Sequence, residues 1–122
     1  PLLREKRVHF IINAAQPVIQ YPDDFVVVTL DALDSDDQDM TQFFDQTHEF
    51  INRAFNEGSG VLIHCIAGIS RSACLAMSYI MKYKNMSFSD TFDLLRSKRN
   101  QVEPNMSFQV QLIDYEKELA SR

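Results

Sequence analysis

The sequence predicts an α/β fold in which helices flank a central, mainly parallel sheet. Three short runs, at 8–13, 25–29 and 61–65, are apolar over most of their length and rich in β-branched residues. Continuous apolar runs of this length are typical of strands covered on both faces, as in parallel sheets. Between and after them, apolar residues recur at helical spacing. The predicted element order is therefore β-β-α-β-α-α-α.

Turn residues and helical periodicity place the first elements in order. Proline residues within 17–22 mark a loop between the first two strands. In the segment 41–56 the residues expected to face inward recur every three or four positions, which predicts a helix. The two glycines of 58–60 end that helix and lead into the central strand. His48 is expected to be a partly exposed residue of this helix.

Three further helices are expected after the central strand. The first covers about 70–84, and the second starts near Ser87, where Ser-Phe-Ser-Asp resembles a capping box. The last starts after Pro104-Asn105. The apolar residues expected on their buried faces are Ala73, Met77, Ile80, Met81, Phe92, Leu95, Phe108, Leu112, Tyr115 and Leu119.

Bulk properties are those of one domain spanning residues 1–122. The chain is 45% apolar, which suffices for an ordinary core, and its formal net charge is −5. This charge argues against nucleic acid or an anionic membrane as a partner. The sequence also lacks an apolar stretch approaching the ~18 residues of a membrane-spanning helix.

The two cysteines, Cys65 and Cys74, are too few for a disulfide framework and lack the neighbours of a metal site. A reducing intracellular compartment, cytoplasmic or nuclear, is therefore expected, and no metal or cofactor is predicted. Cys74 falls near the buried stripe of its helix. It is interpreted as a core thiol rather than a resolving cysteine.

The segment 64–72, HCIAGISRS, predicts a phosphate-binding loop with a thiolate at its base. Cys65 follows the central strand, Arg71 comes six positions later, and Gly68 allows the tight loop between them. The following helix directs its positive end at the same point. A cysteine there can have a pKa of ~3.5–7.5 instead of ~8.5. An inert core cysteine is the alternative, but this spacing favours a cysteine-dependent phosphatase.

Each residue of the segment has an expected role. Arg71 presents a planar fork that can bind two phosphate oxygens at once. The Ser72 hydroxyl can stabilise the thiolate, and His64 can orient the loop. The residues whose backbone N–H groups are expected to bind phosphate are Ile66, Ala67, Gly68, Ile69, Ser70 and Arg71.

The chain resembles the dual-specificity protein phosphatases, a branch of the cysteine-based protein tyrosine phosphatase superfamily. HCIAGISRS matches the family's His-Cys-x5-Arg-Ser loop without a gap. The segment 8–14 is similar to a family strand that ends in Asn, and 104–112 is similar to part of the last family helix. The resemblance implies a phosphatase-like sheet that lacks the family's first strands, as in an amino-terminally truncated catalytic domain.

The resemblance also implies a general acid about thirty residues before the cysteine. Asp34 lies 31 residues before Cys65, and its offset from the next helix fits the family best. The remaining acidic residues of the same loop stay open as rivals. They are Asp31, Asp36, Asp37 and Asp39.

The implied activity is hydrolysis of phosphotyrosine and phosphoserine or phosphothreonine in proteins through a phosphocysteine. The partner would be a phosphorylated protein, with a protein kinase as one candidate. Two alternatives remain: the same chemistry on a lipid, RNA or glycan phosphate, or an inactive phosphate-binding module. Lipid-directed relatives carry lysines in the loop, whereas Ile66, Ala67 and Ile69 are neutral. Inactive relatives typically replace the cysteine, which is present here as Cys65.

Overall fold

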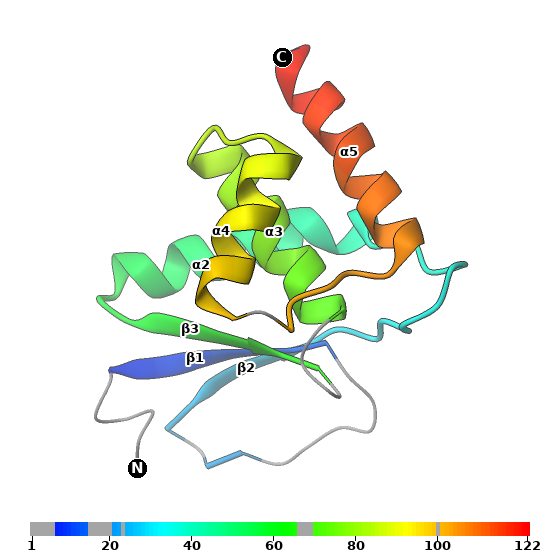
Figure 1. The fold of residues 1–122 in the computed structure, drawn as a ribbon. Helices are drawn as coiled ribbons and strands as arrows, with labels where there is room; N and C mark the ends of the chain where they lie inside the picture. Colours follow the sequence, from blue (N-terminus) through cyan, green and yellow to red (C-terminus); the bar gives the residue numbers. More distant parts are fainter. Residues whose placement is uncertain (1–6, 15–20, 23, 66–69, 100) are drawn as a thin grey trace.

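The computed structural model describes residues 7–14, 21–22, 24–65, 70–99 and 101–122. Within these ranges the predicted order of strands and helices is confirmed, with one short 3-10 helix added before the first α-helix (Figure 1). The elements are β1 (Val8–Asn13), β2 (Val26–Thr29), η1 (Thr41–Phe43), α2 (Phe44–Asn56), β3 (Gly60–His64), α3 (Arg71–Tyr83), α4 (Phe88–Lys98) and α5 (Met106–Ala120).

The sheet is parallel, with the strand order β2-β1-β3. The central strand β1 is the most buried, and Ile11 and Ile12 are fully inaccessible. The α/β prediction is therefore confirmed. Over the described ranges the sheet has three strands with β3 at one edge, which agrees with a phosphatase sheet that lacks its first strands.

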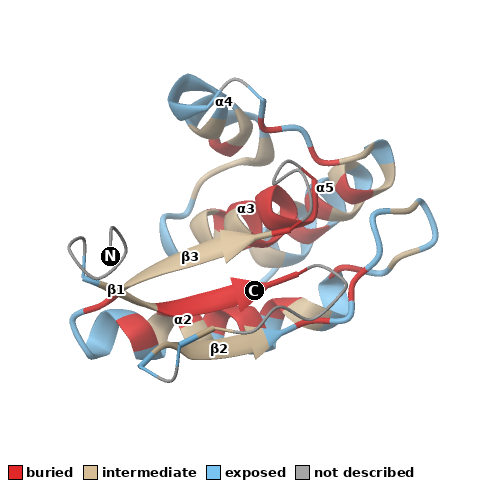
Figure 2. Ribbon diagram, turned by 90° about the horizontal axis from the view of Figure 1, so that it is seen from below, coloured by how far each residue is buried: buried red, intermediate tan, exposed pale blue. Residues whose placement is uncertain are grey.

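The four α-helices lie on one face of the sheet (Figure 1). Helix α2 packs across β1, where the ring of Phe50 meets that of Phe10 edge-on at 5.3 Å. The side chains of β3 are only half-buried (Figure 2). The expectation of strands covered on both faces is thus not met by the described helices, because all of them gather on the same side.

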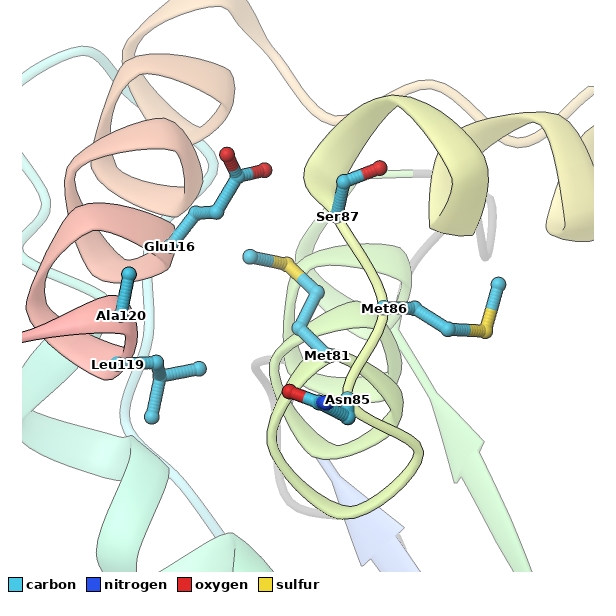
Figure 3. A pocket seen from close by; sticks show the side chains of 7 residues that line it. All are labelled: Met81, Asn85, Met86, Ser87, Glu116, Leu119 and Ala120. Carbon is cyan, nitrogen blue, oxygen red and sulfur yellow. The ribbon is translucent and has the colours of Figure 1, made fainter. Parts of the chain in front are cut away.

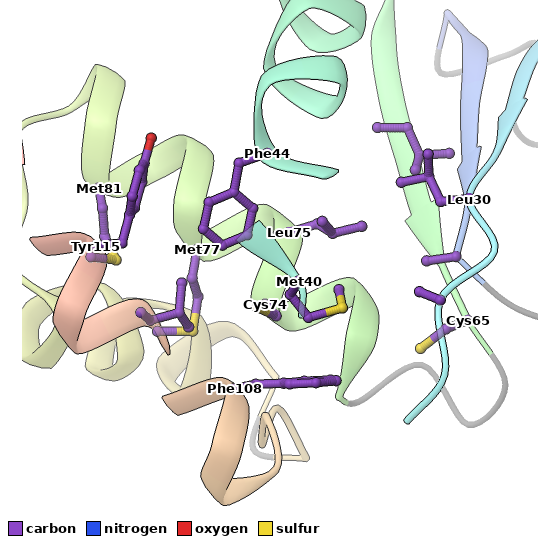
Figure 4. Close-up of a cluster of buried hydrophobic side chains, with 14 of the residues drawn as sticks. Leu30, Met40, Phe44, Cys65, Cys74, Leu75, Met77, Met81, Phe108 and Tyr115 are labelled. Carbon is purple, nitrogen blue, oxygen red and sulfur yellow. The ribbon is translucent and has the colours of Figure 1, made fainter. Parts of the chain in front are cut away.

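The hydrophobic core lies between the sheet and helices α2, α3 and α5 (Figure 4). Met40, Leu75, Phe108 and Leu112 are fully buried there. Burying each such side chain contributes roughly 1.5–3 kcal/mol relative to leaving it exposed. Because α3 and α5 share this core, the start of α5 is fixed relative to the start of α3.

His48 is buried, with 2% of its surface exposed, so the expectation of partial exposure is wrong. Its Nε2 lies 2.9 Å from the Ser78 hydroxyl of α3. Its ring stacks on Phe44 and meets the rings of Tyr79 and Tyr83 edge-on. Aromatic side chains from α3 cover this histidine, and the helical pattern of its own segment does not reveal that cover.

The last two helices begin at side-chain caps. The Ser87 hydroxyl accepts the N–H of Asp90 at 3.0 Å, which is the first of the two bonds of a capping box. At the other end of α5, Glu116 and Leu119 face the turn between α3 and α4, and Met81 reaches toward them (Figure 3). The Glu116 carboxylate also accepts the backbone N–H of Phe88, and this bond ties the far end of α5 to the start of α4.

Candidate active site

Cys65 follows the last residue of β3 and lies at the carboxyl end of the parallel sheet. The preceding residue, His64, pairs with Asn13 of β1, and the His64 carbonyl oxygen accepts the N–H of Ala14 at 2.8 Å. The Cys65 side chain is 8% exposed. Cys65 lies at this point because β3 ends at His64 and α3 begins at Arg71.

The sulfur of Cys65 contacts Ser72 in the first turn of α3. The N–H of Ser72 donates to the sulfur at 3.5 Å, and the Ser72 hydroxyl oxygen lies at the same distance. Burial alone raises the pKa of the thiol. The two Ser72 contacts and the positive charge of Arg71 outweigh burial and hold the pKa below its ordinary value. The site thus stabilises the thiolate relative to an ordinary cysteine, in keeping with a sulfur near a helix N-terminus.

Arg71 is the first residue of α3 and is buried, with 7% of its surface exposed. Its Nη1 donates to the Ala32 carbonyl oxygen at 3.0 Å, which fixes the guanidinium plane. Its Nε is buried and finds no hydrogen-bond partner among the described residues. A buried, charged N–H group without a partner is energetically unfavourable, so this Nε is well placed to bind an anionic acceptor.

Ser70 is buried, and its hydroxyl accepts the backbone N–H of Asn105 at 3.0 Å. This bond ties the end of the phosphate-binding segment to the start of α5. The other predicted phosphate-binding residues, Ile66 to Ile69, lie outside the described part of the chain.

His64 is half-buried, and its Nε2 contacts the hydroxyl of Tyr21. The two rings lie 6.0 Å apart in an edge-on arrangement. Burial lowers the pKa of His64 and raises that of Tyr21, so both are neutral near pH 7. His64 therefore joins the strand end to the segment at Tyr21 through a neutral contact.

Asp34 is exposed, and its Oδ1 accepts a hydrogen bond from Asn105 Nδ2 at 2.9 Å. It lines one pocket together with Ser70 and Asn105. The hydrogen bond between Asp34 and Asn105 could not be predicted from the sequence, because the two residues are 71 positions apart. The structure thus brings Asp34 beside the end of the phosphate-binding segment.

The rival acidic residues differ in their surroundings. The Asp39 carboxylate accepts bonds from the N–H and hydroxyl of Thr41, the first residue of η1, at 3.0 and 2.6 Å. Asp31, Asp36 and Asp37 are exposed. Of the five, Asp34 lines the pocket that also contains Ser70.

Two contributors to the site escaped the sequence prediction. The Ala32 carbonyl that orients Arg71 is a backbone group and leaves no trace in the sequence. From the sequence, Asn105 stands just before the last helix and within a segment similar to the family's, but no role in the site is predicted for it. Its position before a helix marks it as an N-cap, and it does accept the Phe108 N–H at 2.9 Å.

Neither a metal cluster nor a membrane span is found over the described ranges. These residues hold no group of three or more His, Cys, Asp or Glu side chains arranged to bind a metal ion. None of their helices is long and apolar enough to cross a membrane.

Comparisons with known proteins agree with the site. Residues 1–118 match the family model "Dual specificity phosphatase, catalytic domain". The chain is 40% identical to Dual specificity protein phosphatase 1B of Arabidopsis thaliana over 111 residues, covering 91% of this chain and 66% of that protein. It is 49% identical to MAP kinase phosphatase with leucine-rich repeats protein 3 of Dictyostelium discoideum over 89 residues, covering 73% of this chain and 10% of that protein.

Solved structures show the same architecture. The human tyrosine phosphatase-like serine/threonine/tyrosine-interacting protein is 32% identical, with a TM-score of 0.93 over 98% of this chain and 83% of that one. Human DUSP28 is 27% identical, with a TM-score of 0.90 over 98% of this chain and 81% of that one. The fold and the site define a cysteine-based phosphatase domain. The chain belongs to the dual-specificity phosphatase catalytic-domain family.

Proposed function

We propose that this chain hydrolyses phosphate monoesters of tyrosine and of serine or threonine in proteins, through a phosphocysteine intermediate. The observation that carries the proposal is the pairing of a Cys65 thiol of lowered pKa with the buried Arg71 guanidinium at the start of α3. A nucleophilic anion and a fixed cation at one helix N-terminus are what phosphoryl transfer to sulfur requires.

In the first proposed step, the Cys65 thiolate attacks phosphorus and forms the S–P bond as the P–O bond to the substrate breaks. Asp34, in its protonated form, gives its proton to the departing oxygen, so the alcohol or phenol leaves neutral. Arg71 neutralises the charge on the equatorial oxygens. The Nε of Arg71, which has no partner among the described residues, is well suited to this contact, because Nη1 is already held by Ala32.

In the second proposed step, water attacks the phosphocysteine while the Asp34 carboxylate takes up one of its protons. The S–P bond breaks and its electron pair returns to the Cys65 sulfur. The Ser72 hydroxyl and N–H, both 3.5 Å from the sulfur, stabilise the thiolate as it leaves. Inorganic phosphate is released and Asp34 is again protonated.

Protein substrates are favoured over other phosphates by the composition of the loop and by the relatives. The loop between Cys65 and Arg71 has no lysine to bind additional phosphates. One similar protein is named a MAP kinase phosphatase. A phosphorylated protein, with a protein kinase among the candidates, is therefore the proposed partner. The chemistry needs reduced Cys65, so we also propose a reducing cytoplasmic or nuclear location.

The test is turnover of an aryl phosphate and of phosphopeptides by the 122-residue chain and its variants. Cys65→Ser should abolish activity. Asp34→Ala should retain binding but slow turnover, so that phosphoprotein substrates can be captured and identified by mass spectrometry. Undiminished turnover by Cys65→Ser would exclude the mechanism, and undiminished turnover by Asp34→Ala would mean that another group is the acid.

A further inference from the structure

The loop that follows Asp34 is hydrogen-bonded through its backbone to a single side chain of α5, the carboxamide of Gln111. Gln111 Nε2 donates to the Gln38 carbonyl oxygen at 2.9 Å, and Gln111 Oε1 accepts the N–H of Met40 at 2.8 Å. One side chain therefore satisfies a backbone acceptor and a backbone donor of the loop, as a neighbouring strand would. The Met40 side chain is fully buried, so the backbone at this point is fixed from both sides.

Further hydrogen bonds hold the residues on either side of Asp34. Ser107 Oγ accepts from the Gln111 carboxamide at 3.2 Å and donates to the Asp36 carbonyl oxygen at 2.9 Å. Within the loop, the Gln38 side chain accepts the N–H of Leu33 at 2.9 Å. The loop is thus bonded both before and after its acidic residue.

The same end of α5 is also bonded to the phosphate-binding segment. Asn105, immediately before the helix, donates through its backbone N–H to Ser70 and through its side chain to Asp34. The first half of α5 is therefore a common support for the loop of the acid and for the segment beside the nucleophile. The position of Asp34 relative to Cys65 depends on this support.

We propose that Gln111 is a positioning residue for proton transfer by Asp34. The inference rests on the proposed phosphatase function. The side-chain amide of Gln111 forms hydrogen bonds with the loop and with Ser107, so its effect on chemistry passes through the position of the loop. General acids act only within hydrogen-bond reach of the leaving oxygen. A misplacement of about 1 Å can lower a rate by about 100-fold.

Gln111→Met tests the proposal, because methionine keeps the length of the side chain and removes its hydrogen bonds. Two substrates separate acid catalysis from general damage: p-nitrophenyl phosphate, whose leaving group needs little protonation, and phenyl phosphate, whose leaving group needs it. We expect kcat/KM to fall about 10- to 100-fold for phenyl phosphate and less than about 3-fold for p-nitrophenyl phosphate. Gln46→Met, an exposed glutamine of α2, is the matched control and should change neither rate.

A double variant provides the second criterion. In an Asp34→Asn background the acid is already absent, so adding Gln111→Met should lower the phenyl phosphate rate less than about 3-fold further. Amide hydrogen exchange of Met40 should become faster in Gln111→Met at unchanged overall fold. If Gln111→Met does not fold, Ser107→Ala removes the hydrogen bond to the Asp36 carbonyl instead. It should lower kcat/KM selectively for phenyl phosphate, by a smaller factor.

Several results would overturn the proposal. They are an equal loss on both substrates, no loss on phenyl phosphate, and a full additional loss in the Asp34→Asn background. Failure of the proposed function has a different signature, because the unmodified chain would then hydrolyse neither substrate. Wild-type activity that disappears in Cys65→Ser, without any selective effect of Gln111→Met, would leave the function intact and reject the role of Gln111.

Discussion

Removing the Ser72 hydroxyl should raise the pKa of the Cys65 thiol. The hydroxyl oxygen lies 3.5 Å from the sulfur and, in the thiolate form, donates its hydrogen to it. The Ser72 N–H and the Arg71 charge remain in a Ser72→Ala variant. The variant therefore isolates one of the interactions that favour the anion.

The size of the effect follows from the energy of a hydrogen bond to a charged group. Such a bond contributes roughly 1.5–3 kcal/mol, and about 1.4 kcal/mol corresponds to one pH unit. The pKa of the thiol should therefore rise by about 1 to 2. At a pH well below both values, the thiolate population and the alkylation rate should fall about 10- to 100-fold.

The assay is the pH dependence of alkylation by iodoacetamide, read by mass spectrometry at each cysteine. Cys74 is an internal control, because burial raises the pKa of its thiol and it is fully inaccessible. Label should appear first on Cys65 in both proteins, with the Ser72→Ala curve displaced to higher pH. An unchanged curve would show that the hydroxyl does not stabilise the thiolate, and equal labelling of Cys74 would contradict the assigned environments.

Three further predictions concern single side chains. Arg71→Lys keeps the charge but loses the fork and the bond to Ala32, and steady-state kinetics should show kcat/KM lowered about 100- to 1000-fold. Burial lowers the pKa of His48 to about 4 from 6.5, helped by the nearby Lys82 charge. Since the unfolded chain takes up this proton at higher pH than the folded chain, stability should fall as pH drops through that interval, by about 2 kcal/mol near pH 5. Urea unfolding of His48→Phe should not show this fall in stability. The same pH dependence of stability in His48→Phe and in the unmodified chain would refute the assignment to His48. Leu112→Ala should lower the free energy of unfolding by about 2–5 kcal/mol in the same assay, and a loss below about 1 kcal/mol would mean that the core refills the cavity.

Local patterns in the sequence are enough to predict the strands, the helices and the order of the key residues. Apolar runs and helical spacing depend on burial of one surface, which every element shows in its own residues. Cys65, Arg71 and Ser72 are close in sequence, so their convergence at a helix N-terminus follows from the strand–loop–helix order. The contact between Ser72 and the Cys65 sulfur is predictable for the same reason.

The contacts between distant segments were not predictable. Arg71 is oriented by a carbonyl 39 residues away, and Asp34 is held by a side chain 71 residues away. Such pairs depend on how α3 and α5 pack against the chain that follows β2, which single-sequence patterns do not specify. The burial of His48 escaped for the same reason, because residues of α3 cover it. Asp34 itself was singled out by family resemblance, and its place in the pocket with Ser70 became visible only in the structure.

The covalent intermediate offers the most direct test of the proposed chemistry. Acid quenching during turnover of an aryl phosphate, followed by peptide mass spectrometry, should find one added phosphoryl group on the Cys65 peptide. The Cys74 peptide should remain unmodified. Continued turnover with the phosphoryl group on another residue, or with no phosphorylated peptide under conditions that preserve thiophosphates, would contradict a cysteine nucleophile at the end of β3.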